Sequence, residues 1–141
     1  MSRVVKAKDA VVAQDLRKTY GAGESQVTAL NNASIRVGVS KFLAIMGPSG
    51  SGKSTLMQCL AGLDSIDSGN IKIGGIDITS LNDRDLTRLR REHVGFVFQH
   101  FNLVSTLTAE QNIMLPMKLA KRQVDQELFN NVVERLGIKS R

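Results

Sequence analysis

The sequence lacks the features that mark secreted and membrane-spanning proteins. Its 141 residues include a single cysteine, Cys59, so no disulfide can form within the chain. No apolar run approaches the ~20 residues that a membrane-spanning helix needs. The basic start at Met1–Lys6 is not followed by the apolar core of a signal peptide. We therefore expect a cytoplasmic protein, with Cys59 as a small buried apolar residue.

Aromatic residues are also scarce, at 4% of the chain, and the net charge is +6. A positive balance suits a nucleic acid, an anionic membrane surface or a phosphate-binding site. The densest basic cluster is interleaved with acidic residues and carries no aromatic residues that would stack on bases; it consists of Arg84, Arg88, Arg90 and Arg91. This pattern favours a solvated helix face with ion pairs, and we expect no nucleic-acid partner.

What the sequence does contain is a complete phosphate-loop motif at Gly47–Ser54, GPSGSGKS. The apolar run 42–46 before it is typical of a strand buried on both faces of a parallel sheet. Residues 53–63 after it suit a helix that Gly62 ends in a left-handed conformation. Strand, glycine loop and helix in this order predict a nucleotide site, against the alternative of a Gly/Ser-rich turn that matches by chance.

The chemistry of the motif comes from its backbone. Gly50 and Gly52 have no Cβ, so the chain can turn tightly and direct successive N–H groups inward. The helix that begins near Lys53 adds unpaired N–H groups and the positive end of its dipole. We expect Lys53 to reach the β- and γ-phosphates of a nucleotide, and the Ser54 hydroxyl to bind Mg²⁺.

The rest of the chain predicts a mixed α/β fold. Further strands are expected at residues 10–16, 27–30, 33–37 and 94–98, with a glycine-rich loop at 17–24, a turn at Asn31-Asn32 and a hairpin at 71–78 around Gly74-Gly75. Further helices are expected at 81–91, 109–115 and 122–136. The expected N-caps are Ser80 and Thr108, and the expected helix ends are Pro116 and Gly137.

Beyond the phosphate loop, a series of short segments follows in a specific order: LMQCLAGLD at 56–64, DSG at 67–69, LRR at 89–91, VGFVFQ at 94–99, FNL at 101–103, LTA at 107–109 and LP at 115–116. Together they resemble the ATP-binding subunit of an ATP-binding cassette (ABC) transporter, most of all the lipoprotein-release and macrolide-export group. The resemblance covers about residues 16–137. It implies the ABC-type fold of the phosphate-loop NTPases, with an N-terminal antiparallel β subdomain, part of the core and the start of the helical subdomain.

The resemblance also implies roles for single residues. The nucleotide would be held by Tyr20, Gly47, Pro48, Ser49, Gly50, Ser51, Gly52, Lys53, Ser54 and Thr55, with Tyr20 stacked on the adenine. Gln99 would sense the γ-phosphate, join Lys53 in catalysis and join Ser54 in binding Mg²⁺. The residues alone leave two alternatives open: Tyr20 as a loop residue packed on the core, and Gln99 as the polar end of a strand.

The partners that the resemblance implies are a membrane permease and a second nucleotide-binding domain. Residues 100–116 match the region that faces the permease in this family. Phe101, Leu103 and Leu107 either contact that partner or pack in a small core of their own. The chain would then act at the inner face of the cell membrane through its permease.

In this family a signature segment of LSGGQ type, a Walker B strand ending in Asp-Glu and a switch histidine follow the position of Gly137. The sequence contains none of them, and neither His93 nor His100 fits the switch position. We therefore expect residues 1–141 to be the N-terminal part of a nucleotide-binding domain. A truncated chain, a split or frameshifted gene and an incomplete sequence all remain open as the cause.

The resemblance implies ATP binding and, in the complete domain, ATP hydrolysis that powers a permease of the export or lipoprotein-release type. One alternative is a nucleotide-binding fragment without turnover, because half of the site is missing. Another is a different phosphate-loop enzyme such as a nucleotide kinase, which the hairpin at 71–78 and the strand at 94–98 argue against.

Overall fold

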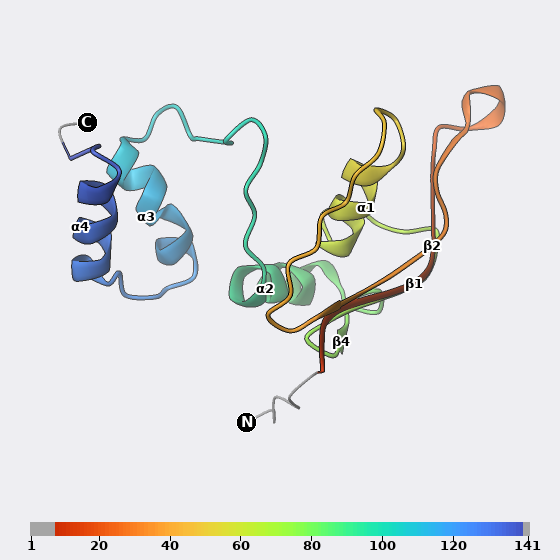
Figure 1. Cartoon of the computed structure of the whole chain (residues 1–141), viewed down its shortest axis with the longest axis horizontal. Coiled ribbons are helices and arrows are strands. Elements are labelled where there is room, and N and C mark those ends of the chain that lie inside the picture. Colours follow the sequence, from red (N-terminus) through yellow and green to blue (C-terminus); the bar gives the residue numbers. More distant parts are fainter. Residues whose placement is uncertain (1–7, 140–141) are drawn as a thin grey trace. The chain divides into compact units, whose positions relative to one another are not determined.

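The computed structural model describes residues 8–139, and these divide between Thr87 and Arg88 into two compact units (Figure 1). The first unit contains β1 (Asp9–Tyr20), the short 3₁₀ helix η1 (Gly23–Ser25), β2 (Val27–Gly38), α1 (Lys53–Leu60), β3 (Ser68–Ile73) and β4 (Ile76–Asp77). Helix α2 (Asp83–His93) runs across the division, and α3 (Ala109–Leu119) and α4 (Gln126–Arg135) belong to the second unit. Within residues 8–139, the helices are too short or too polar to span a bilayer.

The strands form one antiparallel sheet in the order β2-β1-β3-β4, which confirms the expected N-terminal β subdomain. β1 and β2 run side by side as a long ribbon (Figure 1). The predicted loop at 17–24 is wrong in its first half, because β1 continues to Tyr20 through pairs such as Lys18 with Leu30 and Tyr20 with Val27. The strand ends directly before Gly21, so the glycines mark its end and only the residues before them were misassigned.

The Asn31-Asn32 turn is also wrong, because β2 is one strand of 12 residues. The register slips at this point: Leu16 pairs with Ala33, whereas Lys18 pairs with Leu30, so β2 has one residue more than β1 between the two pairs. Asn32 takes up the extra length with a φ of 53°. Asparagine tolerates this left-handed conformation better than most residues, so the pair forms a bulge within a strand.

The hairpin around Gly74-Gly75 is confirmed, with Ile73 paired to Ile76 and positive φ at both glycines. Its strands bring Ile71 and Ile73 into the core of the first unit, where Leu16 and Cys59 are completely buried. Burial raises the pKa of the Cys59 thiol, as expected for a structural cysteine.

Helix α1 begins at Lys53 as predicted and ends near Gly62, which has a φ of 65°. The N–H groups of Gly62 and Leu63 close the end by donating to Cys59 and Gln58, each at 2.9 Å. A Cβ on Gly62 would lie 2.8 Å from Cδ1 of Leu86. Glycine suits this position for its backbone conformation, and a larger residue would have to displace the end of the Leu86 side chain.

The two expected core strands at 42–46 and 94–98 are absent from the structure, where both segments are irregular. Phe42 is 95% exposed and Val97 is 99% exposed. A parallel strand exists only through hydrogen bonds to neighbouring strands, and the sheet formed by residues 8–139 gives these segments no partner. Their apolar sequences predict burial that this chain does not supply by itself.

Several helix boundaries differ from the predictions for local reasons. Asn82, not Ser80, caps α2: its Oδ1 accepts the N–H of Asp85 at 3.0 Å. Thr108 caps α3 as predicted, in a reciprocal capping box with Gln111. Pro116 does not end α3, because its carbonyl still accepts the N–H of Ala120 at 3.0 Å.

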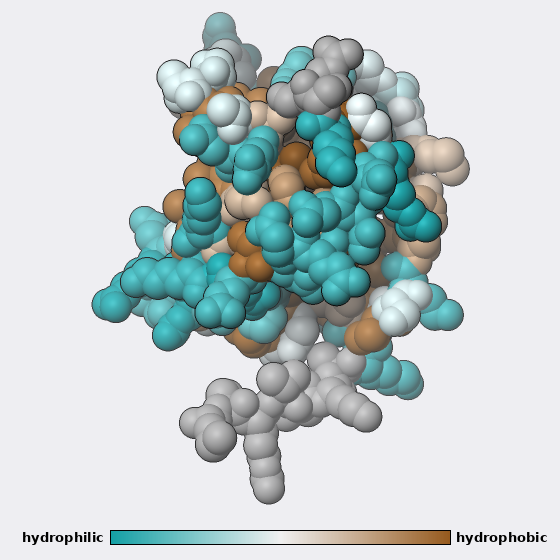
Figure 2. Space-filling view, turned by 90° about the vertical axis from the view of Figure 1, so that its left-hand side faces the viewer, coloured by the Kyte–Doolittle hydropathy of each residue, from teal (hydrophilic) through white to brown (hydrophobic). Residues whose placement is uncertain are grey.

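Helix α4 begins at Gln126, later than the predicted residue 122, because Asp125 accepts the N–H of Leu128 and caps it. Gly137 ends the helix as expected, with a φ of 64°. Apolar residues on this element stay accessible: Leu128 is 61% exposed and Leu136 is 64% exposed. Figure 2 shows a face of the chain on which apolar side chains are exposed among polar ones.

β1 contains a bulge of its own at Gln14 and Asp15, where its pairing with β2 shifts register between Ala13 and Leu16. The close approach of β3 to this bulge leads to a prediction for Gly69. Its φ is 104°, and a Cβ there would lie 2.6 Å from the Gln14 carbonyl oxygen and 2.7 Å from that of Asp15. We expect Gly69→Ala to lower the free energy of unfolding by at least about 2 kcal/mol, measured by urea denaturation followed by circular dichroism.

Gly74→Ala is the matched control, because Gly74 also has positive φ but nothing within 4 Å of a Cβ. It should cost only the backbone strain of about 1 kcal/mol. Equal losses for the two variants would contradict the tight contact between β3 and the bulge.

Candidate functional site

The phosphate loop turns into α1 at Gly52, which is the N-cap residue and has a φ of 83°. Gly50 is also in the left-handed region, with a φ of 78°. These values confirm the tight turn that the glycines predicted. A Cβ on Gly52 would lie 2.4 Å from the carbonyl oxygen of Ala29 on β2. The bend is therefore pressed against the sheet, and only glycine fits at this position.

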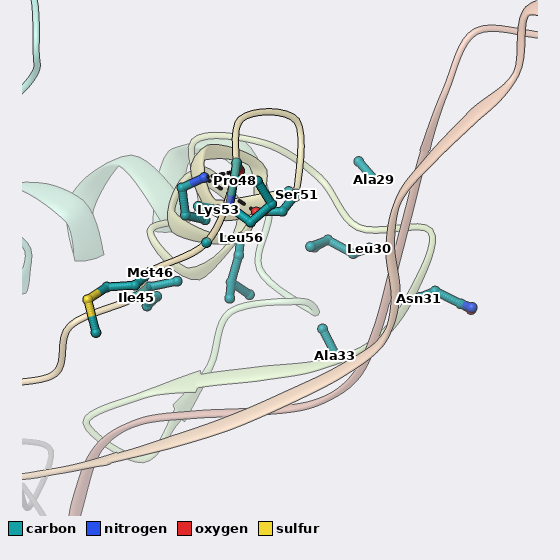
Figure 3. Close-up of a pocket in the computed structure, with 12 residues that line it drawn as sticks. Ala29, Leu30, Asn31, Ala33, Ile45, Met46, Pro48, Ser51, Lys53 and Leu56 are labelled. Carbon is teal, nitrogen blue, oxygen red and sulfur yellow. Dashed lines mark hydrogen bonds between the residues drawn. The ribbon is translucent and has the colours of Figure 1, made fainter.

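The ammonium group of Lys53 folds back onto the loop. Its Nζ donates to the carbonyl oxygen of Pro48 at 2.6 Å and to Oγ of Ser51 at 3.3 Å, as the dashed lines in Figure 3 show. Both acceptors belong to the loop itself. The positive charge thus lies within the curve of the motif, where a phosphate oxygen would replace the carbonyl as its partner.

The N-terminus of α1 keeps its positive character. No side chain caps the helix, and its first turn contains no acidic residue. The first N–H groups of a helix have no partner within that helix, and its dipole adds about half a positive charge. With Lys53 beside them, these groups have the positive charge and the hydrogen-bond donors that an anion such as phosphate requires.

A hollow of about 380 Å³ lies between the loop and β2 (Figure 3). Its wall is largely apolar and includes Leu30, Ile45 and Leu56, together with Lys53. Of the ten residues predicted to hold the nucleotide, the hollow includes Gly47, Pro48, Ser51, Gly52 and Lys53 but not Tyr20. It lies on the sheet side of the loop, and it is not by itself a complete nucleotide pocket.

Tyr20, the predicted adenine contact, lies at the end of β1 and is 39% exposed, so it is not a core residue. Its hydroxyl donates to Oδ2 of Asp64 at 2.6 Å. The buried Lys18 donates to Oδ1 of the same carboxylate at 2.9 Å, and its ammonium lies 5.0 Å above the centre of the Tyr20 ring. We call these three residues the Asp64 cluster.

The titration of the cluster follows from these contacts. The hydrogen bond from Tyr20, followed by that from Lys18, lowers the pKa of Asp64. The same bonds raise the pKa of both donors. Thr55, on the first turn of α1, acts on Tyr20 in the opposite direction through its own side chain.

Gln99 lies in the second unit, in the irregular segment after α2, and is exposed. Its roles toward the γ-phosphate and Mg²⁺ remain predictions. Phe101 is 79% exposed and Leu103 is 71% exposed, so neither packs in a core. The following turn is held by Asn112, whose side chain bonds both the N–H and the carbonyl of Val104.

Mg²⁺ prefers hard oxygen ligands and usually takes only one or two of them from the protein beside phosphate oxygens. Ser54 fits that role, because it is exposed on the first turn of α1, next to Lys53. Residues 8–139 contain no group of three or more His, Cys, Asp or Glu side chains placed to hold a metal. The donor set of the loop thus suits a cation that arrives with a polyphosphate.

Lys18 and Asp64 were not among the predicted site residues. One signal was available: beyond the bulge at Asp15, residues 16, 18 and 20 alternate, so Lys18 shares a face of β1 with the buried Leu16 and with Tyr20. A lysine at a buried strand position calls for a carboxylate partner. Which carboxylate supplies it depends on the path of the chain after α1.

The comparisons with known proteins agree with this geometry. The model of a family described as ABC transporter matches residues 30–141. Over 128 residues the chain is 41% identical to the bacitracin export ATP-binding protein BceA of Halalkalibacterium halodurans, covering 89% of this chain and 51% of that protein. It is 42% identical over 130 residues to the macrolide export ATP-binding/permease protein MacB of Escherichia coli K12, covering 91% of this chain and 20% of that protein.

Solved structures show the same similarity. The bacterial ABC transporter cassette MJ0796 in its dimeric structure matches with a TM-score of 0.79 and 38% identity, over 88% of this chain and 54% of that one. A second MJ0796 structure, bound to ADP and Pi, matches equally well at 39% identity. The chain therefore spans about half the length of BceA and of MJ0796, and a fifth of MacB.

The family match covers most of the chain, and the phosphate loop, the antiparallel β subdomain and the helices fall within a shared fold. The expected resemblance is thus confirmed at the level of the family, including its macrolide-export members. The chain belongs to the ABC transporter family, and it forms part of that family's phosphate-loop ATP-binding domain.

Proposed function

We propose that the chain binds ATP together with Mg²⁺ through its phosphate loop, and that the complete domain hydrolyses ATP to power a membrane permease. One observation carries this proposal. The N-terminus of α1 has no side-chain cap and no acidic residue in its first turn, and the Lys53 ammonium is hydrogen-bonded to the loop beside it. Such a site suits the triphosphate rather than a neutral ligand. The solved relative bound to ADP and Pi supports the same ligand class.

Different residues of the chain would bind different parts of the nucleotide. The loop amides around Gly50 and Gly52 would donate to phosphate oxygens, while Lys53 would exchange the Pro48 carbonyl for the β- and γ-phosphates. Because the bend is fixed against Ala29, these donors need little rearrangement before binding. Thr55 and Tyr20 would lie on the side of the base.

The Ser54 hydroxyl would ligate Mg²⁺, with Gln99 as a further oxygen ligand and γ-phosphate sensor. When bound there, Mg²⁺ would supply positive charge that offsets the negative charge of the phosphate groups during hydrolysis. Gln99 lies in the second unit, so its contribution belongs to the assembled domain. Lys53 and Gln99 are the residues that we place in catalysis.

The partners in this proposal are a permease of the export or lipoprotein-release type and a second ATP-binding domain. The named relatives include two export proteins, and MJ0796 was solved as a dimer. The exposed Phe101 and Leu103 are the side chains that we assign to the permease contact. A chain docked in this way would act at the cytoplasmic face of the membrane.

A chain that binds nucleotide without turning it over is the second candidate. The observation in its favour is the share of the relatives that the chain spans, about half of BceA and of MJ0796. Measuring phosphate release beside nucleotide binding separates the two. Binding without release supports the second candidate, whereas steady release by the 141-residue chain supports the first.

Replacing Lys53 tests the site directly. Lys53→Ala should weaken Mg²⁺-ATP binding by at least about 2 kcal/mol, because one charge-assisted contact to the phosphates is lost. Isothermal calorimetry of the 141-residue chain measures the change. Lys41→Ala is the matched control, since Lys41 is an exposed lysine shortly before the loop, and it should leave the affinity unchanged. An unaltered affinity in Lys53→Ala would remove the lysine from its assigned role.

Removing Mg²⁺ distinguishes the role of Ser54 from that of Lys53. In the presence of Mg²⁺, Ser54→Ala should bind ATP about tenfold more weakly than the wild type, because one oxygen ligand is lost. With the metal chelated by EDTA, the two proteins should bind ATP equally. Lys53→Ala should be impaired under both conditions. A loss in Ser54→Ala that does not depend on the metal would contradict the assignment of its hydroxyl to Mg²⁺.

A further inference from the structure

The Asp64 cluster joins the end of β1 to the loop that follows α1. One carboxylate accepts two side-chain hydrogen bonds, from the Tyr20 hydroxyl at 2.6 Å and from the Lys18 ammonium at 2.9 Å. Lys18 also donates to Oγ of Ser65 at 3.3 Å. The Asp67 N–H donates to the Arg17 carbonyl at 2.8 Å and fixes the loop backbone to the strand.

The cluster fixes the position of the Tyr20 ring as well as pairing the charges of Lys18 and Asp64. Lys18 is buried, with 7% of its surface exposed, and its ammonium lies over one face of the Tyr20 ring. Tyr20 keeps 39% of its surface exposed, so part of its side chain remains accessible to a ligand. A buried cation beneath and a carboxylate at the hydroxyl together restrict both rotations of the tyrosine side chain.

The ring lies close to the phosphate loop. Gly52, the N-cap residue of α1, lies against Ala29 and Leu30 of β2, and Leu30 pairs with Lys18, two residues before Tyr20 on β1. All of these residues belong to the first unit, so their placement does not depend on the second. A ligand whose phosphates sit at the start of α1 would therefore have a prearranged aromatic surface within reach of its base.

From this arrangement we infer that Asp64 is a positioning residue for base recognition. It fixes the Tyr20 ring so that the free face can stack on the adenine of a bound nucleotide, while Lys18 holds Asp64 in place. This inference rests on the proposed ATP site and concerns the base end of the same ligand. A ring that is already held loses less conformational freedom when the base stacks on it.

Two ligands separate this role from a general structural one. Mg²⁺-ATP carries the base, and Mg²⁺-tripolyphosphate carries only the phosphates. In Tyr20→Phe and Asp64→Asn, ATP should bind about three- to tenfold more weakly, whereas tripolyphosphate should bind as it does to the wild type. The double variant should be no weaker than the single ones, because both disrupt the same pairing of the Tyr20 hydroxyl with the Asp64 carboxylate.

Asp67→Asn is the matched control, since Asp67 is an exposed carboxylate in the same loop and the substitution removes the same charge. It should leave both affinities unchanged. Tyr20→Phe removes only a hydroxyl from an exposed ring and keeps the test valid if Asp64→Asn folds poorly.

Each result of these measurements either supports or overturns the positioning role of Asp64. Unchanged ATP affinity in both variants overturns the positioning role, and so does an equal loss for ATP and tripolyphosphate. If the wild-type chain binds tripolyphosphate but ATP no more tightly, base recognition fails while the phosphate site stands. If it binds neither ligand, the proposed function itself is overturned.

A spectroscopic measurement follows the ring alone, because Tyr20 is the only tyrosine and the chain has no tryptophan. The groups that face the phenol are Asp64, Lys18 and Thr55, and the hydrogen bond to Asp64 raises the pKa of Tyr20 above 10.0. Asp64→Asn should lower this pKa toward 10.0 in a titration followed by tyrosinate absorbance. Added ATP should quench the tyrosine fluorescence less in Asp64→Asn than in the wild type; equal titration and equal quenching would overturn the inference.

Discussion

The structure depends on one close contact, in which the backbone of Gly52 lies against the carbonyl of Ala29 on β2. No residue with a Cβ fits there, because that atom would lie 2.4 Å from the carbonyl oxygen. The contact sets the direction in which α1 leaves the sheet. It therefore also sets where the free N–H groups of the helix point, and where the Lys53 ammonium can reach. The anion site follows from the way that a sheet and a helix meet.

Helix α1 connects the two ends of the proposed nucleotide site. Its N-terminus carries the phosphate loop, and the turn at its C-terminus leads to Asp64, which holds Tyr20. The short, buried Cys59 on this helix and the close contact between Gly62 and Leu86 fix it in the first unit. This helix of eight residues thus holds the N–H groups at its start and the residue that fixes the Tyr20 ring at a set distance from each other.

The features that the sequence predicted correctly are those that short stretches of residues determine. The bend at Gly50 and Gly52, the start of α1 and the Gly74-Gly75 hairpin each rest on local backbone preferences, and all are confirmed. The strands predicted at 42–46 and 94–98 were wrong, because a buried parallel strand is defined by its neighbours rather than by its own residues. The apolar character of Phe42 and Val97 indicates a need for burial without supplying the partner.

The Asp64 cluster shows the same limit at the level of side chains. Alternation along β1 places Lys18 on the buried face, but the carboxylate that pairs with it lies 46 positions further along the chain. Only the path of the chain around α1 brings the two together. The extension of β1 to Tyr20 likewise depends on pairing with β2.

The central claim is that the backbone at the start of α1 grips a polyphosphate. Amide chemical shifts of the 141-residue chain, recorded with and without Mg²⁺-tripolyphosphate, test it most directly. The account predicts that the largest changes fall on the N–H groups of Gly50, Gly52, Lys53 and Ser54. Largest changes among the arginines of α2, with the loop unaffected, would contradict it.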